Sequence, residues 1–328
     1  MTTDLCPYFG KCGGCVYQDM PTDDYLAMKK RYVMRCFSDC GLSPDIQDII
    51  SVPIHSRRRA SFAFHKGHLG FNENKSHTII DINECRLLTE NLCNILSPLR
   101  EFIKTLNETG DVFVLDTPYG IDMHIKTKSK NRPNLALLEQ LAFFANQNNI
   151  ARLLYNNDPI AEQTRLPFPP DVFLQPSLAG ETTLVNLMTS HIGEAKTALD
   201  LFCGTGTFTK PLINAGLTVK GYDSSVDSVK TLGSYGQVRD LFRNPLLPSE
   251  LNGIDIVVID PPRAGAKAQI EQLAQADIHK IIMISCNPSS AARDIKVLID
   301  NGWTLDPITL VDQFTYSGHV ELFCVLSK

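Results

Sequence analysis

The sequence predicts an α/β protein, with a Rossmann-like, doubly wound parallel sheet in its C-terminal half and an α+β domain before it. From Phe173 onward, short apolar segments alternate with helical ones, which indicates a parallel sheet covered by helices. Before Pro167, alternating segments follow one another at hairpin spacing, which favours an antiparallel sheet. The Pro-rich stretch at 167–170 marks a boundary. We therefore expect domains at residues 1–165 and 166–328.

In the N-terminal half, residues 1–20 are rich in Cys and Gly and have little periodicity. A helix is predicted over Asp23–Cys40, with Thr22 or Asp23 as its cap. The strands predicted from alternation are Arg59–His65, His68–Asn72, Thr78–Ile82, Asp111–Asp116 and Gly120–Thr127. A second helix is predicted over Leu135–Asn146.

In the C-terminal half, the apolar segments are short enough to be buried strands. They are Ala198–Cys203, Thr218–Tyr222, Ile254–Ile259 and Lys280–Ser285, and helices are predicted to begin at Thr207, Ser225, Lys267 and Pro288. The chain ends in two more apolar stretches, Thr304–Val311 and His319–Leu326. We expect these to be antiparallel strands that close the sheet.

The composition is that of an ordinary globular protein, with 43% hydrophobic and 20% charged residues in 328. The longest apolar runs are far too short to span a bilayer, and the first residues do not resemble a signal peptide. We therefore expect a cytoplasmic, monomeric protein with no membrane contact.

The net charge of −5 does not indicate a nucleic-acid binder, but its distribution is informative. Residues 1–165 hold 19 basic and 19 acidic side chains, so the whole negative charge lies in the second half. Local patches rather than net charge determine phosphate binding. Basic residues cluster in the first half at Lys29, Lys30, Arg31 and Arg35, at Arg57, Arg58 and Arg59, and at Lys126, Lys128, Lys130 and Arg132. They are either solvated surface runs or contacts to a nucleic acid.

A glycine-containing turn follows the first strand of the second half. Gly204 and Gly206 lie in the segment Asp200–Phe208, and glycine at such a turn lets the backbone approach a ligand closely. Asp223 ends the next strand, where a carboxylate can accept hydrogen bonds from ribose hydroxyls. The pattern is G-x-G rather than G-x-G-x-x-G. It therefore favours S-adenosylmethionine over a hydride-transferring dinucleotide.

Asp260-Pro261-Pro262-Arg263 follows the next apolar strand. The carboxyl ends of strands are where such sheets bind ligands, so we expect Asp260 near the cofactor. Enzymes that methylate exocyclic amines often place an aromatic residue after Asp-Pro-Pro. Arg263 stands there instead, which argues against amine methylation.

Cys286 follows the strand after that and precedes a helix, whose dipole favours a thiolate. A thiolate that adds to carbon 6 of a pyrimidine makes carbon 5 nucleophilic, which is covalent catalysis. The proton on carbon 5 must then leave. Glu321 is the first candidate base and His319 the second.

Three cysteines, Cys6, Cys12 and Cys15, lie close together near the N-terminus, and Cys85 is the best candidate for a fourth ligand. Four thiolates suit zinc or an iron–sulfur cluster, and the spacing does not separate the two.

These motifs together resemble the RNA uracil-C5 methyltransferases that carry an N-terminal iron–sulfur cluster. The resemblance covers nearly the whole chain. It includes Cys6–Gln18, Tyr25, Lys29, Arg57–Ala60, Gly70-Phe71 with Ser76, Ile80–Ile82 before Cys85, Phe173–Gln175, Asp200–Phe208, Asp260–Arg263, Ser285–Pro288 and His319–Glu321.

The resemblance implies a class I methyltransferase domain behind a domain that carries a [4Fe–4S] cluster, and a substrate in RNA, with 23S rRNA favoured. It implies cluster ligands at Cys6, Cys12, Cys15 and Cys85. It implies cofactor contacts from Gln175, Phe202, Gly204, Asp223 and Asp260, with Cys286 as nucleophile and Glu321 as base.

The chain departs from the family at some positions. Cys6 stands almost at the start, so we expect the small β-barrel domain of longer members to be absent. Ser177 and Thr207 stand where Asn is common, and Asp223 replaces the commoner Glu.

Two other functions fit parts of the pattern. One is methylation of tRNA uracil or of cytosine, although cytosine enzymes generally place Pro before the nucleophilic Cys, where this chain has Ser285. The other is a non-catalytic iron–sulfur protein that binds RNA or senses redox state, which would not need Cys286.

Overall fold

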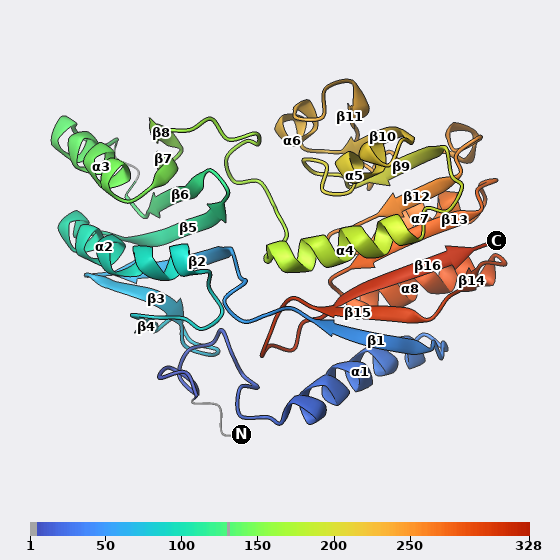
Figure 1. Cartoon of the computed structure of the whole chain (residues 1–328), viewed down its shortest axis with the longest axis horizontal. Helices are drawn as coiled ribbons and strands as arrows, with labels where there is room; N and C mark the ends of the chain where they lie inside the picture. Colours follow the sequence, from blue (N-terminus) through green and yellow to red (C-terminus); the bar gives the residue numbers. More distant parts are fainter. Residues whose placement is uncertain (1–4, 130–131) are drawn as a thin grey trace.

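The computed structural model describes residues 5–129 and 132–328. Its strands form two sheets that lie side by side, one built mainly from the first half of the chain and one mainly from the second (Figure 1). Lys130, which belongs to one of the basic clusters, lies outside the described residues. No helix in the described part of the chain has the length and apolar character needed to cross a membrane.

The first sheet has the strand order β4-β3-β2-β5-β6-β7-β8. Its strands are β2 (Arg59–His65), β3 (His68–Asn72), β4 (Ile79–Asp81), β5 (Thr109–Thr117), β6 (Gly120–Thr127), β7 (Ile150–Tyr155) and β8 (Asp158–Glu162). All neighbours are antiparallel except β6 and β7, which are parallel. The predicted antiparallel sheet is therefore present, with two further strands.

Two helices, α2 (Glu90–Leu106) and α3 (Leu135–Gln147), cover one face of this sheet (Figure 1). The alternation along β2 and β5 explains why. Phe62, Phe64, Val112 and Val114 point into the core beneath the helices, and successive side chains in a strand point to opposite faces. Their neighbours, such as Phe113, therefore lie on the other face.

The second sheet has the strand order β1-β15-β16-β13-β12-β9-β10-β11, with β14 paired to β16. The strands from the second half are β9 (Thr197–Leu201), β10 (Thr218–Asp223), β11 (Gly236–Val238), β12 (Ile256–Ile259), β13 (Lys280–Ser285), β14 (Thr304–Leu305), β15 (Ile308–Asp312) and β16 (Glu321–Ser327). The four central strands from β13 to β10 are parallel, and β16 is antiparallel to both its neighbours. The predicted closing strands are confirmed.

The helices of this half are α4 (Leu178–Ser190), α5 (Thr209–Asn214), α6 (Val226–Lys230), α7 (Lys267–Leu273) and α8 (Pro288–Asp300), with short 3-10 helices at Gly233–Tyr235 and Pro248–Glu250. They cover the sheet so completely that all four residues of β12 are buried. Burial on both faces explains why the sequence there is a continuous apolar run rather than an alternating one.

The chain between residues 22 and 51 packs with the second sheet. Helix α1 (Thr22–Ser38) contacts α8, and β1 (Ile46–Ser51) pairs in parallel with β15 at the sheet edge (Figure 1). The division between residues 165 and 166 stays a prediction. Residues 22–51 belong to the predicted first domain by sequence, but they pack with the sheet of the second half.

Candidate active site

The carboxyl ends of β9, β10, β12 and β13 carry most of the predicted site residues. We call this edge the catalytic rim. Gly204 lies in the turn after β9, Asp223 ends β10, Asp260 follows β12 and Cys286 follows β13. Because these strands are parallel neighbours, their ends meet along one edge, where sheets of this kind bind ligands.

Cys286 and Glu321 are brought together by the pairing of β13 with β16. Ser285 is paired with Leu322 in this antiparallel register. Cys286 follows Ser285 and Glu321 precedes Leu322, so the two side chains come to the same end of the pair. A residue from the last strand of the fold thus reaches a rim built by parallel strands.

The surroundings of Cys286 act in both directions on the predicted thiolate. Burial and the carboxylates of Glu321 and Asp260 raise the pKa of Cys286, while the Arg263 side chain opposes them through its charge and a hydrogen bond. Cys286 does lie beside a helix N-terminus, since Asn287 caps α8. Burial and the two carboxyl groups oppose the effect of that dipole.

Glu321 is a buried carboxyl, only 2% exposed. Burial raises its pKa to about 7, against a hydrogen bond from Gln313 and the charge of Arg263, which lower it. The pKa of Asp260 is raised by burial and by the charges of Glu321 and Asp200. A pKa near neutral leaves Glu321 partly ionised at that pH, and the ionised form can accept a proton during a reaction.

A chain of side-chain amides links these carboxyls. Gln313 Nε2 donates to Gln175 Oε1 at 2.8 Å and to Glu321 Oε2 at 2.9 Å. Gln175 Nε2 in turn donates to Asp260 Oδ2 at 3.3 Å. The sequence motifs contain Gln175 but not Gln313. The signal that could have found it is the polar pair Asp312-Gln313 directly after an apolar strand.

Lys29 does not belong to a basic surface patch, contrary to one reading of its cluster. It is 1% exposed. Its ammonium group forms an ion pair with Asp312 and donates to the carbonyl of His319 at 2.6 Å. Tyr25 Oη also donates to Asp312, at 2.7 Å. Helix α1 is thereby tied to the 313–320 loop that leads into Glu321.

Two more residues of the basic clusters contact other groups of the protein. Arg58 is buried and bonds Glu181 at 2.6 Å and the Gln175 carbonyl at 2.9 Å. Arg57 lies near Cys15 and Cys85, and burial lowers its pKa against the opposing effect of those cysteines. Of this cluster, Arg59 alone reaches the open face of the first sheet.

The turn after β9 leaves room for a ligand. Gly204 has φ +53°, and no heavy atom lies within 4 Å of the position a Cβ would take. Its N–H donates to Asp223 Oδ2 at 3.0 Å, and Ser225 N–H donates to Oδ1 at 2.8 Å. Phe202 has φ +63°, uncommon for a residue with a side chain. Its ring lies 5.4 Å from that of Phe242.

Asp200, beneath this turn, is fully buried. Thr209 donates to its Oδ2 at 2.5 Å, but Oδ1 has no partner among the described residues. Burial raises the pKa of Asp200 to about 7, and the charge of Asp223 adds to the rise. Space over Gly204 and an unsatisfied buried oxygen below it fit a turn that a polar ligand completes.

The four predicted cluster cysteines line one cavity of about 430 Å³, together with Arg57, Arg263 and His319. We call it the cysteine cavity. Burial and the charges of Cys85, Cys12 and Cys6 raise the pKa of Cys15 to about 12. Among the described residues, no three His, Cys, Asp or Glu side chains come close enough to hold a metal ion. The structure therefore groups the cysteines without showing a metal site.

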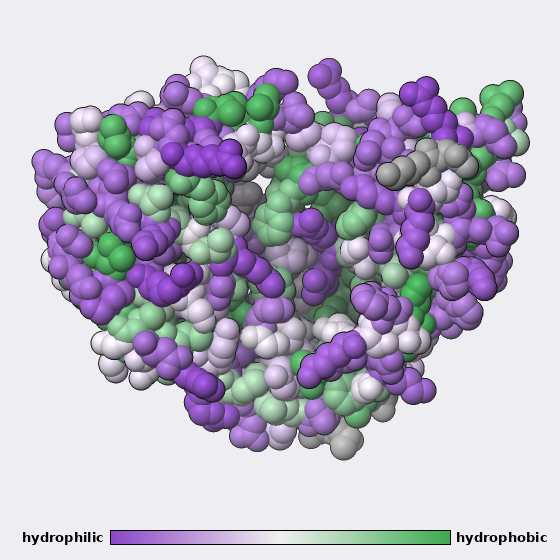
Figure 2. Space-filling view, turned by 180° about the vertical axis from the view of Figure 1, so that it is seen from behind, coloured by the Kyte–Doolittle hydropathy of each residue, from purple (hydrophilic) through white to green (hydrophobic). Residues whose placement is uncertain are grey.

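His319, the second candidate base, lies toward this cavity. It is exposed, and its ring lies 5.8 Å from that of Phe314. The cavity runs from the cysteines to Arg263, beside Cys286. Seen from behind, the molecule is hollowed between its two halves (Figure 2).

Comparison with known proteins gives consistent results. The profile of a family described as tRNA (Uracil-5-)-methyltransferase matches residues 234–328. An uncharacterized RNA methyltransferase of Brucella suis is 34% identical over 98% of this chain and 84% of its own length. The 23S rRNA (uracil(1939)-C(5))-methyltransferase of Tolumonas auensis is 30% identical over 97% of this chain and 80% of its own length.

The whole fold also has a solved counterpart. The Pyrococcus abyssi tRNA (uracil-54, C5)-methyltransferase, in complex with S-adenosyl-L-homocysteine, superposes with a TM-score of 0.74 over 98% of this chain and 86% of that one, at 23% identity. At that identity, the similarity concerns the fold. The sequence relatives, aligned over nearly the full length, carry the assignment: the chain belongs to the family of RNA uracil-C5 methyltransferases.

Proposed function

We propose that this protein methylates carbon 5 of a uracil in RNA through a covalent bond from Cys286 to carbon 6, with Glu321 as the base. One observation carries the proposal: Cys286, Asp260 and Glu321 meet at one end of neighbouring strands, close enough to shift one another's pKa. Nucleophile and base thus share one site with a second carboxyl.

The rim fits S-adenosylmethionine, which supplies the methyl group when bound. Asp223 would hold the ribose hydroxyls, and the open space at Gly204 would admit the cofactor beside the backbone. Phe202, Gln175 and Asp260 would complete the contacts. A cofactor with a positive charge placed near Asp260 also favours the anionic forms of the neighbouring acids. Binding would thereby reverse the rise in the pKa of Cys286.

In the reaction, the Cys286 thiolate adds to carbon 6, and the electron pair of the C5–C6 double bond moves toward the carbonyl at carbon 4. Carbon 5 becomes nucleophilic and takes the methyl group. Glu321 then removes the remaining proton from carbon 5, the double bond re-forms and Cys286 leaves as thiolate. Gln313 is a positioning residue here, because its N–H group holds Glu321 as an acceptor.

The target we propose is 23S rRNA, because the Tolumonas auensis relative named for that activity aligns over nearly the whole chain. The second candidate is tRNA, which is named in the family description that matches residues 234–328. Mapping 5-methyluridine in 23S rRNA and tRNA from cells with and without the gene separates them. Loss of a methyl group from 23S rRNA alone supports the first, and loss from tRNA alone supports the second.

We further propose that the cysteine cavity holds a [4Fe–4S] cluster on Cys6, Cys12, Cys15 and Cys85. The donor set is four thiols around one cavity, as such clusters need. A zinc ion would require all four sulfurs about 2.3 Å from one point, whereas in a cluster each sulfur binds a different iron. The role we propose is structural.

Cys286→Ala tests the proposed chemistry. The variant should lose methyl transfer by about 10³-fold or more, because no other group can add to carbon 6. Its affinity for S-adenosylmethionine, measured by calorimetry, should stay near that of the wild type. Cys40→Ala, which changes a half-buried cysteine that packs on the core, is the matched control. Methylation at carbon 5 by Cys286→Ala would rule out the covalent route.

A further inference from the structure

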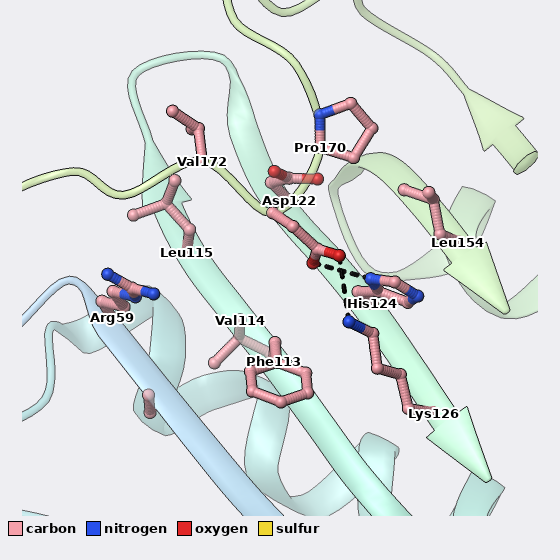
Figure 3. Close-up of a pocket in the computed structure, with 12 residues that line it drawn as sticks. Arg59, Phe113, Val114, Leu115, Asp122, His124, Lys126, Leu154, Pro170 and Val172 are labelled. Carbon is pink, nitrogen blue, oxygen red and sulfur yellow. Dashed lines mark hydrogen bonds and ion pairs between the residues drawn. The ribbon is translucent and has the colours of Figure 1, made fainter. Parts of the chain in front are cut away.

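The face of the first sheet that α2 and α3 leave open carries a second cavity, of about 210 Å³ (Figure 3). Phe113, on β5, lies at its floor and is 37% exposed. Its register partners are Ser61 on β2 and His124 on β6. An aromatic ring in the middle of an open sheet face is how several RNA-binding sheets stack unpaired bases.

Two cationic side chains, Lys126 and Arg59, line the cavity with Phe113. Lys126 Nζ lies 5.0 Å from the centroid of the Phe113 ring, and Arg59 lies over the exposed ring of Phe173, 4.9 Å from its centroid. Within the described part of the chain, the Arg59 guanidinium has no hydrogen bond or ion pair. Burial and the charge of Arg57 lower the pKa of Arg59, and the charge of Asp171, which Lys126 and His124 share, opposes them. An anion at this point would relieve that repulsion.

The acidic side chains of the cavity are already paired. Asp171 accepts from Lys126 at 2.9 Å and lies 2.8 Å from His124 Nδ1. Asp122 accepts two hydrogen bonds from Arg152, at 2.8 and 2.6 Å. The carboxylates are therefore neutralised, and the charge left unpaired is that of Arg59. The cavity suits a planar ring with a phosphate beside it.

The cavity adjoins the cysteine cavity. Ala60 lines both this cavity and the cysteine cavity, and Ser61, beside Phe113, lines the latter. The cysteine cavity extends to Arg263, whose side chain hydrogen-bonds Cys286. A single strand of RNA with its target base at Cys286 could thus run past the cysteines onto this sheet face.

We propose that the Phe113 cavity is a subsite for an unpaired base of the RNA strand that carries the target uracil. The base stacks on Phe113, and Arg59 binds the adjoining phosphate. The inference rests on the proposed function in that the ligand is RNA. It concerns a base other than the one methylated.

The test compares Phe113→Ala with Phe143→Ala. Phe143 is an exposed phenylalanine of the same half, on α3, at the helix-covered side of the sheet. Binding of a short fluorescent oligouridylate is measured by anisotropy, and methylation of 23S rRNA and tRNA transcripts is followed as KM and kcat. Phe113→Ala should weaken oligouridylate binding by about tenfold, the effect of one lost stacking contact. It should raise KM with little change in kcat.

Two further variants sharpen the result. Phe113→Tyr keeps a ring and should restore binding to near the wild-type value. Arg59→Gln should weaken binding and reduce its salt dependence, since one phosphate contact is lost. If Phe113→Ala binds and methylates like Phe143→Ala while the wild type is active, the subsite is wrong and the proposed function stands. If the wild type methylates neither RNA, the proposed function itself fails.

Discussion

The catalytic rim and the cysteine cavity both gather buried ionisable side chains, but the chain positions them differently. At the rim, Asp260 and Cys286 directly follow strands, and Glu321 begins one. A chain of hydrogen bonds through Gln175 and Gln313 fixes the carboxyls. Strand register therefore builds the rim before any ligand arrives.

The cysteine cavity is built from loops instead. Cys6, Cys12 and Cys15 lie in the segment before α1, and Cys85 lies between β4 and α2. The segment is attached to both halves, through Gly13 N–H to the Asn72 carbonyl at 3.0 Å and Val16 N–H to the Tyr316 carbonyl at 2.9 Å. Burial and mutual repulsion raise the pKa of Cys12, Cys15 and Cys85. The rim is therefore held by strand pairing and side-chain hydrogen bonds, whereas the four cysteines are held by loops.

The largest difference between the cysteine cavity and the catalytic rim is expected in the variant Cys15→Ser, which should affect the first and not the second. Anaerobically purified wild-type protein should contain about four iron atoms per chain and absorb visible light, and the variant should lose nearly all of both. The rim should persist, so affinity for S-adenosylmethionine should change little. Cys40→Ser is the control for losing a thiol elsewhere. Zinc and no iron in the wild-type protein would contradict the proposed iron–sulfur cluster.

The variant Lys29→Met should lower the stability of the protein without unfolding it, because it breaks the buried ion pair with Asp312 behind the rim. Leaving one buried charge unpaired should cost about 3–5 kcal/mol in the free energy of unfolding, measured with urea. Arg31→Met, on the exposed side of α1, should change it by less than about 0.5 kcal/mol.

The double variant Lys29→Met/Asp312→Leu separates charge from packing. It should recover part of the lost stability, because it leaves no unpaired carboxylate. Equal loss in the single and double variants would mean that lost packing around Lys29, rather than an unpaired carboxylate, causes the loss of stability.

The variant Gln313→Leu should have a smaller effect, namely a shift in the pH dependence of kcat/KM. Glu321 must be ionised to accept a proton, so kcat/KM should rise with pH through its raised pKa of about 7. The hydrogen bond from Gln313 lowers that pKa. Removing the bond should raise it and move the acidic limb of the pH profile to higher pH. A limb that stays in place or moves to lower pH would show that Gln313 does not act on Glu321.

The rim could be predicted from the sequence because its residues follow buried strands, which appear as short apolar runs. Ile254–Ile259, for example, corresponds to β12, and the residues after it are Asp260 to Arg263. Because the strands are parallel, the residues that follow them meet at one edge of the sheet, and this does not depend on the conformation of the loops.

Other features depend on tertiary contacts that no local pattern encodes. Strand β1 is mostly half-exposed or exposed and pairs with residues more than 250 positions away. Helix α2 has Pro98 in its interior, which obscures the helical pattern. Lys29 reads as part of a basic run, and only its distant partner Asp312 explains its burial. The raised pKa of Cys286 also has a tertiary origin, since burial and two carboxyl groups from other strands cause it.

The central claim is the covalent bond from Cys286 to the uracil ring, and Glu321→Gln tests it most directly. Without its base, the enzyme should add to the ring and transfer the methyl group but be unable to release the product, and turnover should slow by about 10²–10⁴-fold. After incubation with S-adenosylmethionine and labelled substrate RNA, a protein–RNA adduct should appear on a denaturing gel, and it should be absent from the Cys286→Ala/Glu321→Gln double variant. An adduct that persists in the double variant, or a slowed enzyme that accumulates none, would contradict the account.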